Sequence, residues 1–324
     1  MPRTDVLLVS VASTAGWKRS ARELAGSLSR AGVRVETVTT PAPPRVRTFA
    51  LTDLVEARAA RRACREGIAT HDPAAIVYCS ITAALLWPRP GAVWLDSIAA
   101  ENRPGRHGIW QRTVERRRLA RAPLVLAMSE GALGALDGRR GPMLVVPTPV
   151  DRSGPAAAER DVAAVTYAGN PEKKRLEHVL AAWARARREH ETLVVAGIDG
   201  FDAPAGVRVA GRLTPDEYRA LLRRARVFVA APTREDYGIA PLEALADGCL
   251  LVTTPAPGPY PALELARRLD PRLVSDELHN ALRLALDDPV AGYRERASEL
   301  LVPFTRQAVD RTVAEEVVPR LLPA

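Results

Sequence analysis

Two glutamates, Glu235 and Glu243, stand eight positions apart in a segment that reads as a strand, a polar loop and the start of a helix. Residues 227–231 form an apolar run typical of a strand, Pro241 suits a first helical turn, and Gly248 can end the helix. A helix that opens there directs unpaired backbone N–H groups and a partial positive charge at the loop, which favours a phosphate. A carboxylate accepts hydrogen bonds from the hydroxyl groups of a sugar ring or a ribose. The segment therefore indicates a ligand that joins phosphate to hydroxyl-rich rings, as a nucleotide sugar does.

Each glutamate also has a simpler interpretation when it is considered alone. A glutamate in a first helical turn stabilises the helix dipole, which would explain Glu243, and Glu235 could be a loop charge that water solvates. The flanking residues favour a shared role, because the strand, the glycine loop and the proline occur in the order that a phosphate-binding helix start requires.

Residues 227–248 resemble the E-x(7)-E signature of retaining glycosyltransferases of family 4, which have the GT-B fold. The resemblance implies that Glu235 is catalytic and faces the transferred sugar, and that Glu243 binds the nucleotide ribose. It also implies that backbone N–H groups contact the sugar and the diphosphate, namely those of Gly238, Ile239 and Ala240.

Lysine is rare in this chain, and two of the three lysines are adjacent. Lys173 and Lys174 follow an apolar run that ends at Ala168, and they precede a helix expected to begin at Leu176. A cation at the carboxyl edge of a strand can stabilise the negative charge that develops on a diphosphate leaving group. The alternative is a solvated basic first turn, but it would put cations at the unfavourable end of a helix.

The family pattern has an arginine just after the strand glycine and a lysine ahead of the next helix. The resemblance implies that Lys174 is this lysine and acts as an electrostatic catalyst, with Lys173 as the second choice. Asn170 stands at the arginine position in a shorter loop. Asn170 and Arg175 are both assigned to donor binding, with Arg175 as the substitute cation.

Further donor contacts also follow from the resemblance. Residues 207–213 are similar to the strand and turn that seat the nucleotide base through backbone groups, which assigns Arg212 and Leu213 to donor binding. The N-cap of a following helix explains the same residues without a ligand. Gly16 lies where the family has a glycine loop that touches the donor phosphates, although the paired glycines are missing. Asp96 ends a strand where many relatives have a histidine that contacts the sugar, so we assign Asp96 a catalytic contact with donor or acceptor.

Apolar runs alternate with helical patterns along the chain, which predicts an α/β fold with parallel sheets. The expected strands lie at residues 6–9, 33–38, 75–79, 92–95, 124–128, 143–146, 164–168, 193–197, 207–209, 227–231 and 250–253. Helices are expected over 18–30, 51–66 and 306–322, and from about 176, 214, 241 and 276. For this pattern the resemblance implies the GT-B fold, in which two doubly wound, Rossmann-like domains face each other across a cleft.

Pro147, Pro149 and the polar stretch 151–160 interrupt this alternation and predict a domain boundary near residue 150. We expect an N-terminal acceptor-side domain over residues 1–150 and a nucleotide-sugar-binding domain over 151–305. A last helix within 306–324 is expected to cross back to the first domain, as it does in GT-B proteins.

Positive charge is concentrated in the first 150 residues, which hold 22 Lys+Arg against 12 Asp+Glu. Seven arginines gather near Trp110: Arg103, Arg106, Arg112, Arg116, Arg117, Arg118 and Arg121. Such a cluster can meet an anionic membrane surface or an acidic acceptor, or it can simply be solvated. Nucleic acid is not an expected partner, because no recognition motif accompanies the charge.

No apolar run approaches the ~20 residues that a membrane-spanning helix needs, and the run that begins at Val6 reads as a strand rather than a signal peptide. These features predict a cytoplasmic protein that can contact the inner face of the membrane at its periphery. Cys64, Cys79 and Cys249 are far apart and suggest buried thiols rather than a disulfide framework or a zinc site.

The leading hypothesis is a retaining glycosyltransferase that moves a sugar from a nucleoside diphosphate sugar to a glycan, a lipid-linked or a small-molecule acceptor. Dinucleotide, P-loop and zinc-protease motifs are missing, so dehydrogenase, kinase-like and zinc chemistry have little support. A metal ion or cofactor is not expected, because the basic residues and the helix start can neutralise the diphosphate.

Two rival hypotheses remain open. Asn170 and the lack of a histidine at Asp96 would suit a nucleotide-sugar binding protein that has lost catalysis. Ser129 follows an apolar run and precedes Gly131, a weak likeness to the nucleophile turn of serine hydrolases. A helix N-cap explains Ser129 better.

Overall fold

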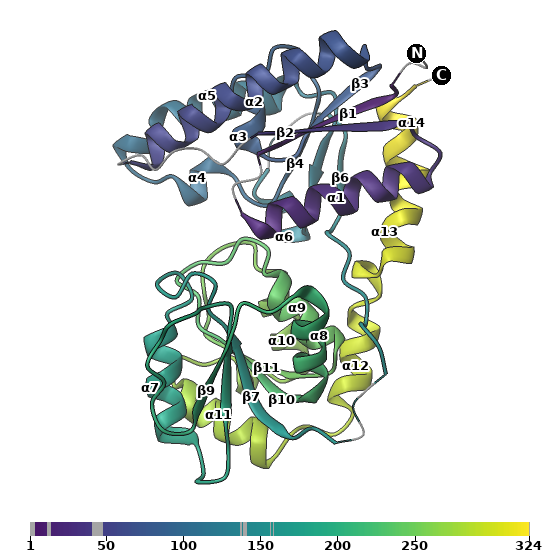
Figure 1. Cartoon of the computed structure of the whole chain (residues 1–324). Coiled ribbons are helices and arrows are strands. Elements are labelled where there is room, and N and C mark those ends of the chain that lie inside the picture. Colours follow the sequence, from purple (N-terminus) through teal and green to yellow (C-terminus); the bar gives the residue numbers. More distant parts are fainter. Residues whose placement is uncertain are drawn as a thin grey trace. The chain divides into compact units, whose positions relative to one another are not determined.

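The computed structural model describes residues 4–11, 14–40, 48–136, 138, 141–155, 157 and 159–323 (Figure 1). The chain divides into two compact units. The first contains Met1–Pro149 together with Phe304–Ala324, and the second contains Val150–Pro303. Each unit has its own parallel sheet.

The first unit is built on a six-stranded sheet in the order β2-β1-β3-β4-β5-β6. Its strands are β1 (Val6–Val11), β2 (Val35–Thr40), β3 (Ala75–Tyr78), β4 (Ala92–Leu95), β5 (Val125–Ala127) and β6 (Met143–Val145). Its connecting helices are α1 (Ala15–Arg30), α2 (Phe49–His71), α3 (Ile81–Ala84), α4 (Ala99–Asn102), α5 (Ile109–Arg121) and α6 (Glu130–Gly134). The inner strands are buried along almost their whole length, because helices cover both faces of a parallel sheet.

The C-terminal segment belongs to the first unit and packs against α1. It consists of α13 (Arg306–Thr312), a π-helical turn (Val313–Val317) and α14 (Val318–Leu321), drawn in yellow beside α1 in Figure 1. Arg30 on α1 donates two hydrogen bonds to Asp310, at 2.6 and 2.8 Å, and Arg306 pairs with Glu23 at 2.7 Å. These ion pairs join the end of the chain to its first helix.

The second unit is built on a five-stranded sheet in the order β11-β10-β7-β8-β9. Its strands are β7 (Val162–Tyr167), β8 (Leu193–Ala196), β9 (Val207–Gly211), β10 (Ala225–Ala230) and β11 (Leu250–Thr253). Its helices are α7 (Leu176–Ala186), α8 (Pro215–Arg224), α9 (Ile239–Ala246), α10 (Pro261–Leu269), α11 (Leu278–Asp287) and α12 (Tyr293–Leu300).

Strands β7 and β10 are neighbours in this sheet, although β8 and β9 lie between them in the sequence. Val227 pairs with Ala164, and the hydroxyl of Thr166 donates to the carbonyl of Val229 at 2.8 Å. The strand order therefore reverses at β7. In open α/β sheets, ligands bind beyond the carboxyl ends of the strands at such a reversal. The loops after β7 and β10 are thus positioned to form a site.

Both sheets are parallel and doubly wound, which confirms the expected α/β fold. Several element boundaries differ from the expectation. Helix α2 continues past Glu66 to His71 and ends at Asp72, whose φ is 40°. Helix α5 was not predicted, because its buried face includes the polar residues Gln111 and Glu115 and so lacks an apolar period.

Glu115 is a carboxylic acid in the interior of the first unit. It is 4% exposed, and its oxygens accept the N–H of Ala99 at 2.8 and 3.0 Å. Burial raises the pKa of Glu115 from its ordinary 4.5 to about 7, although the hydrogen bond from Ala99 and the charge of Arg103 oppose this. The folded protein holds this proton more tightly than the unfolded chain does. Stability therefore falls as the pH rises from about 4.5 through about 7.

Replacing Glu115 by Gln removes the buried ionisation and keeps an oxygen that can accept the N–H of Ala99. We expect the Glu115→Gln variant to be more stable than the parent by about 1–3 kcal/mol near pH 8, because one unit of pKa shift corresponds to about 1.4 kcal/mol. Near pH 5 the two proteins should differ little, since the folded parent is then protonated. Urea denaturation at both pH values measures the difference, and an equal gain at both would contradict a buried charge at this position.

Candidate functional site

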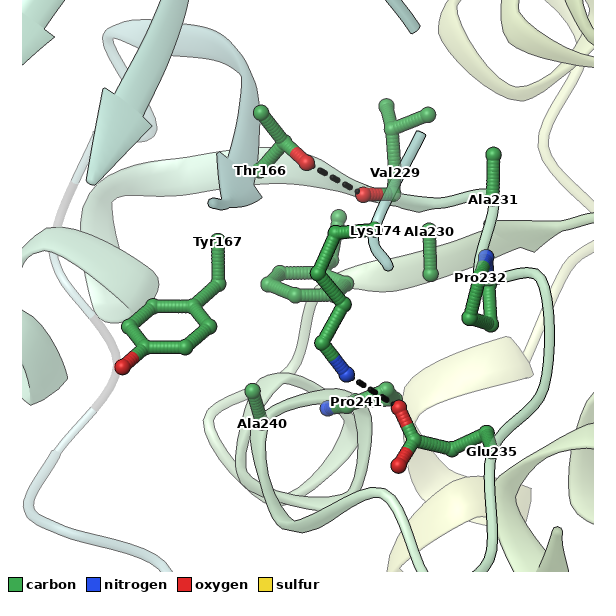
Figure 2. Close-up of a pocket in the computed structure, with 11 residues that line it drawn as sticks. Thr166, Tyr167, Lys174, Val229, Ala230, Ala231, Pro232, Glu235, Ala240 and Pro241 are labelled. Carbon is green, nitrogen blue, oxygen red and sulfur yellow. Dashed lines mark hydrogen bonds and ion pairs between the residues drawn. The ribbon is translucent and has the colours of Figure 1, made fainter. Parts of the chain in front are cut away.

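The loops that follow β7 and β10 meet at the carboxyl edge of the second sheet, where Lys174 and Glu235 form an ion pair. Figure 2 shows the ammonium group of Lys174 directed at the Glu235 carboxylate. The side chains are 29% and 15% exposed, so water screens the pair only in part. The backbone N–H of Thr233 donates to the carbonyl of Lys173 at 2.9 Å and ties the two loops together.

The ion pair lies in the wall of a narrow pocket (Figure 2). The rest of the wall comes from the ends of β7 and β10 and from the first turn of α9: Thr166, Tyr167, Phe228, Val229, Ala230, Ala231, Pro232, Ala240 and Pro241. Most of these side chains are apolar. An apolar surround lowers the local dielectric constant, so a charge that enters the pocket interacts more strongly with the ion pair than it would in water.

Asn170 shapes the loop that presents Lys174. Its side-chain oxygen accepts the N–H of Lys173 at 3.0 Å, and its carbonyl accepts the N–H of Lys174 at 3.0 Å. Arg175 follows as the N-cap of α7 with a φ of 48°, in the left-handed region that non-glycine residues rarely adopt. Asn170 therefore has a role within the turn itself. Contact of Asn170 and Arg175 with a donor stays a prediction.

Helix α9 begins at Ile239, which places Pro241 in its first turn. Gly238 is the N-cap with a φ of 79°, and a Cβ there would lie 2.7 Å from the ring of Tyr260, so only glycine fits. Among the residues that the structure describes, no side chain forms a capping hydrogen bond at this helix start. Its first backbone N–H groups, including those of Ile239 and Ala240, point to the loop and can bind an anion or water.

Glu243 lies in the second turn of α9, because the helix begins two residues before Pro241. The expectation that Glu243 occupies the first turn is therefore wrong, and the explanation through the helix dipole loses its basis. Glu243 is buried, with 5% exposed, and it is not among the described residues that line the pocket of Lys174 and Glu235. Its contact with a ribose stays a prediction.

Arg219 on α8 holds Glu243, and the sequence analysis did not single out this arginine. Arg219 donates to Glu243 at 3.3 Å, to Asp247 at 2.6 Å and to the carbonyl of Asp151 at 2.6 Å. Burial alone would lower the pKa of Arg219, but its hydrogen bond to Asp247 raises it above the ordinary value. The sequence contains no signal for this role, because arginine is abundant and Arg219 lies mid-helix among other arginines.

The turn after β9 contains Arg212 and Leu213. Arg212 forms an exposed ion pair with Asp199 at 3.2 Å, and its backbone N–H donates to the same carboxylate at 3.1 Å. Thr214 caps α8, and its hydroxyl and backbone N–H bond reciprocally with Glu217. The N-cap interpretation is thus observed, whereas the seating of a base by Arg212 and Leu213 stays a prediction.

Gly16 and Asp96 both belong to the first unit. Gly16 lies in the first turn of α1, whose N-cap Thr14 accepts the N–H of Trp17 at 3.2 Å. Asp96 follows β4 and accepts a hydrogen bond from the hydroxyl of Ser97 at 3.3 Å. Contacts of these two residues with donor or acceptor stay predictions.

Ser129 is the N-cap of α6, and its hydroxyl accepts the N–H of Ala132 at 3.1 Å. It is 5% exposed. The N-cap explains the serine, and the hydrolase hypothesis has no further support. In the described part of the chain, no group of three or more His, Cys, Asp or Glu side chains could hold a metal ion. The three cysteines are buried free thiols, as expected.

Part of the arginine cluster stabilises the first unit instead of facing a partner. Arg103 pairs with Asp53 at 2.7 Å, and Arg118 donates to the carbonyl of Leu85 at 2.9 Å and lies 5.1 Å from the ring centre of Trp87. No helix in the described residues is long and apolar enough to cross a membrane. Contact with an anionic surface stays a prediction.

Residues 161–288 match the family model for glycosyl transferases group 1. The matched segment runs from the start of β7 to the end of α11 and includes the Lys174–Glu235 pair and Arg219. The match covers 128 of the 324 residues and shows a group 1 glycosyltransferase domain in the second unit. This result confirms the expected enzyme class. A search of curated protein sequences finds no match.

Solved glycosyltransferase structures resemble this glycosyltransferase over nearly its whole length. Sucrose-phosphate synthase from Thermosynechococcus elongatus matches with a TM-score of 0.67 at 16% identity, over 95% of this chain and 96% of that chain. Anabaena Alr3699/HepE, solved with UDP and glucose, matches with a TM-score of 0.68 at 15% identity, over 97% and 99%. WaaG, a glycosyltransferase involved in lipopolysaccharide biosynthesis, matches with a TM-score of 0.66 at 13% identity, over 98% and 100%. At such identities the likeness shows the fold alone, which is GT-B as expected.

Removing Arg219 would leave Glu243 and Asp247 buried without this cation. We expect the Arg219→Ala variant of this glycosyltransferase to lose about 3–5 kcal/mol of unfolding free energy, the usual cost of deleting one partner of a buried ion pair. Urea denaturation measures the loss.

The matched control is Arg224→Ala, also on α8. Arg224 pairs with Asp161, and these side chains are 51% and 48% exposed, so the loss should be about 1 kcal/mol or less. Equal losses in the two variants would show that Arg219 is not a buried anchor.

Proposed function

We propose that this glycosyltransferase is of the family 4 type and transfers a sugar from a nucleoside diphosphate sugar to an acceptor hydroxyl, with retention at the anomeric carbon. The observation that carries the proposal is the Lys174–Glu235 ion pair, which lines a pocket beside the uncapped start of α9. This arrangement offers a cation, a carboxylate and backbone N–H donors within one pocket wall. A diphosphate linked to a sugar presents groups complementary to all three.

The diphosphate would bind at the start of α9 and at Lys174. The first N–H groups of a helix, here including those of Ile239 and Ala240, have no carbonyl partner within the helix and can donate to an anion, and the helix adds a partial positive charge. As the bond between the anomeric carbon and the diphosphate breaks, negative charge grows on the departing phosphate. Lys174, with Arg175 one residue further, stabilises this charge, and we propose that no metal ion is needed.

Glu235 would bind the sugar of the donor after the diphosphate has displaced the Glu235 carboxylate from Lys174. In the structure the carboxylate neutralises the ammonium group of Lys174. A diphosphate carries more negative charge than one carboxylate, so it competes effectively for the lysine. The released carboxylate can then accept hydrogen bonds from the sugar hydroxyls.

The donor class has support from two solved relatives. Anabaena Alr3699/HepE was solved with UDP and glucose, and pneumococcal O-GlcNAc transferase GtfA with UDP and GlcNAc. A second candidate function is a nucleotide-sugar binding protein without turnover. The observation that favours it is Asn170, which forms the turn where the family resemblance expects an arginine.

Lys174→Ala tests the proposed catalyst, and Lys173→Ala is its matched control because Lys173 is the exposed neighbour outside the pocket. We expect the Lys174→Ala variant to lose at least ~100-fold in turnover, the usual effect of removing one transition-state charge partner. The control should change by less than ~3-fold. Release of nucleoside diphosphate from a donor measures turnover. Equal rates in the two variants would sink the assignment, and donor affinity without any release in the parent protein would favour the binding protein.

The stereochemical outcome tests the retaining assignment. A thermal-shift panel of nucleoside diphosphate sugars identifies the donor first, because a ligand that binds the folded state raises its melting temperature. Proton NMR of the glycosylated product then reports the anomeric configuration. We expect the configuration of the donor to be kept. An inverted product would contradict the family 4 assignment while leaving sugar transfer intact.

A further inference from the structure

The first unit contains a second pocket, whose lining shares no residue with the pocket of Lys174 and Glu235. Its volume is about 660 Å³, within the range of small-molecule binding sites. The lining residues come from the segment after β4 with α4, from one face of α5, and from the end of α6 (helices labelled in Figure 1). Strands β4 and β5 are neighbours in the sheet, so the pocket is built on segments that follow two adjacent carboxyl ends.

The interior of this pocket is mostly apolar. Ile98, Leu119 and Leu136 supply its large side chains, and they pack on the hydrophobic core of the unit. Alanines line much of the remainder, at positions 100, 120 and 135. A methyl side chain fills little volume, so these alanines leave room for a ligand. An open apolar surface of this kind gains free energy when another apolar group covers it.

Two arginine side chains also line this pocket. Arg112 and Arg116 are four residues apart on α5, which places them on one helix face, and both line the pocket. Arg112 is anchored, because its guanidinium donates to the carbonyls of Arg103 and Gly105, the latter at 2.9 Å. Arg116 is exposed and forms no hydrogen bond or ion pair with any residue that the structure describes.

The acidic side chain in the lining does not balance these two cations. Glu115 is buried, and both of its oxygens accept the N–H of Ala99. Because burial raises the pKa of Glu115 to about 7, this carboxyl group is partly uncharged at neutral pH. The lining residues that the structure describes therefore combine an apolar interior with a net positive charge.

We propose that this pocket binds an amphiphilic anion, whose apolar part fills the space between α4, α5 and α6 and whose phosphate or carboxylate meets Arg112 and Arg116. A free sugar is a poor match, because most of the lining lacks hydrogen-bonding groups. Inorganic phosphate is also a poor match, because it would leave the apolar interior uncovered. The inference does not depend on the donor site, since every lining residue belongs to the first unit.

Calorimetric titration of the full chain with decyl phosphate, below its micelle concentration, tests the proposal. We expect saturable binding at one site. Decyl maltoside has the tail without the charge, and inorganic phosphate has the charge without the tail, so each should bind at least ~10-fold more weakly. No saturable binding of decyl phosphate, or equal binding of decyl maltoside, would overturn the proposal.

Two substitutions locate the site. Arg116→Gln should weaken decyl phosphate binding ~10-fold, as expected for the loss of a charge-assisted hydrogen bond. Its matched control is Arg117→Gln, the exposed neighbour that does not line the pocket, and it should change the affinity by less than ~2-fold. Ala120→Phe places a ring in the pocket and should also weaken binding ~10-fold. Because Ala120 is exposed, the larger side chain should not destabilise the folded protein. Equal effects of the two arginine variants would contradict this placement.

Vesicle flotation separates a free amphiphile from a membrane lipid as the source of the ligand. If vesicles with anionic phospholipid bind the protein, and decyl phosphate and Ala120→Phe both reduce this binding, a lipid is the ligand. If decyl phosphate binds but vesicles do not, the ligand is a free amphiphile. A third outcome is that the protein binds vesicles but not decyl phosphate, and that neither decyl phosphate nor the Ala120→Phe substitution reduces vesicle binding. This result would show a basic surface without a binding pocket and would refute the proposal.

Discussion

The ion pair of Lys174 and Glu235 is the contact on which the candidate site in the second unit depends. It forms because the strand order reverses at β7 and brings the loops after β7 and β10 together. A partly exposed pair of this kind adds little stability by itself. The pair matters because the ammonium group of Lys174 and the carboxylate of Glu235 can each bind a group of a ligand. In the proposed function, both would exchange partners when a ligand with phosphate and hydroxyl groups binds beside the pocket, and the start of α9 would supply further donors.

A second charge cluster supports this site from inside the protein. Arg219 binds two carboxylates, Glu243 and Asp247, and also the carbonyl of Asp151. Ser153 adds two hydrogen bonds to Asp247, both at 2.9 Å, from its N–H and its hydroxyl. The cluster therefore joins α8, α9 and the first residues of the second unit at one point. Such groups must satisfy one another because burial removes the water that would otherwise solvate them.

The first unit also places charge in unexpected positions. Helix α5 carries many arginines, yet its buried face includes Gln111 and Glu115. Arg103 and Arg118 turn back to contact Asp53 and the carbonyl of Leu85, so they stabilise the unit. The arginines that line the pocket on α5 are Arg112 and Arg116. The same helix packs Leu119 into the hydrophobic core, because long arginine side chains can keep their charged ends at the surface.

Local sequence patterns were enough to predict the class of fold, because burial on both faces of parallel strands produces apolar runs that can be recognised in short segments. The sequence also indicated Gly238 and Pro241 as a helix start and drew attention to Lys174 through the rarity of lysine. Which side chains form hydrogen bonds and ion pairs with one another could be seen only in the tertiary structure. Whether Glu243 meets the pocket or Arg219 depends on how α8 packs against α9, and α5 escaped detection because its inner face is polar. Contacts between segments distant in sequence are set by packing, and no local pattern encodes them.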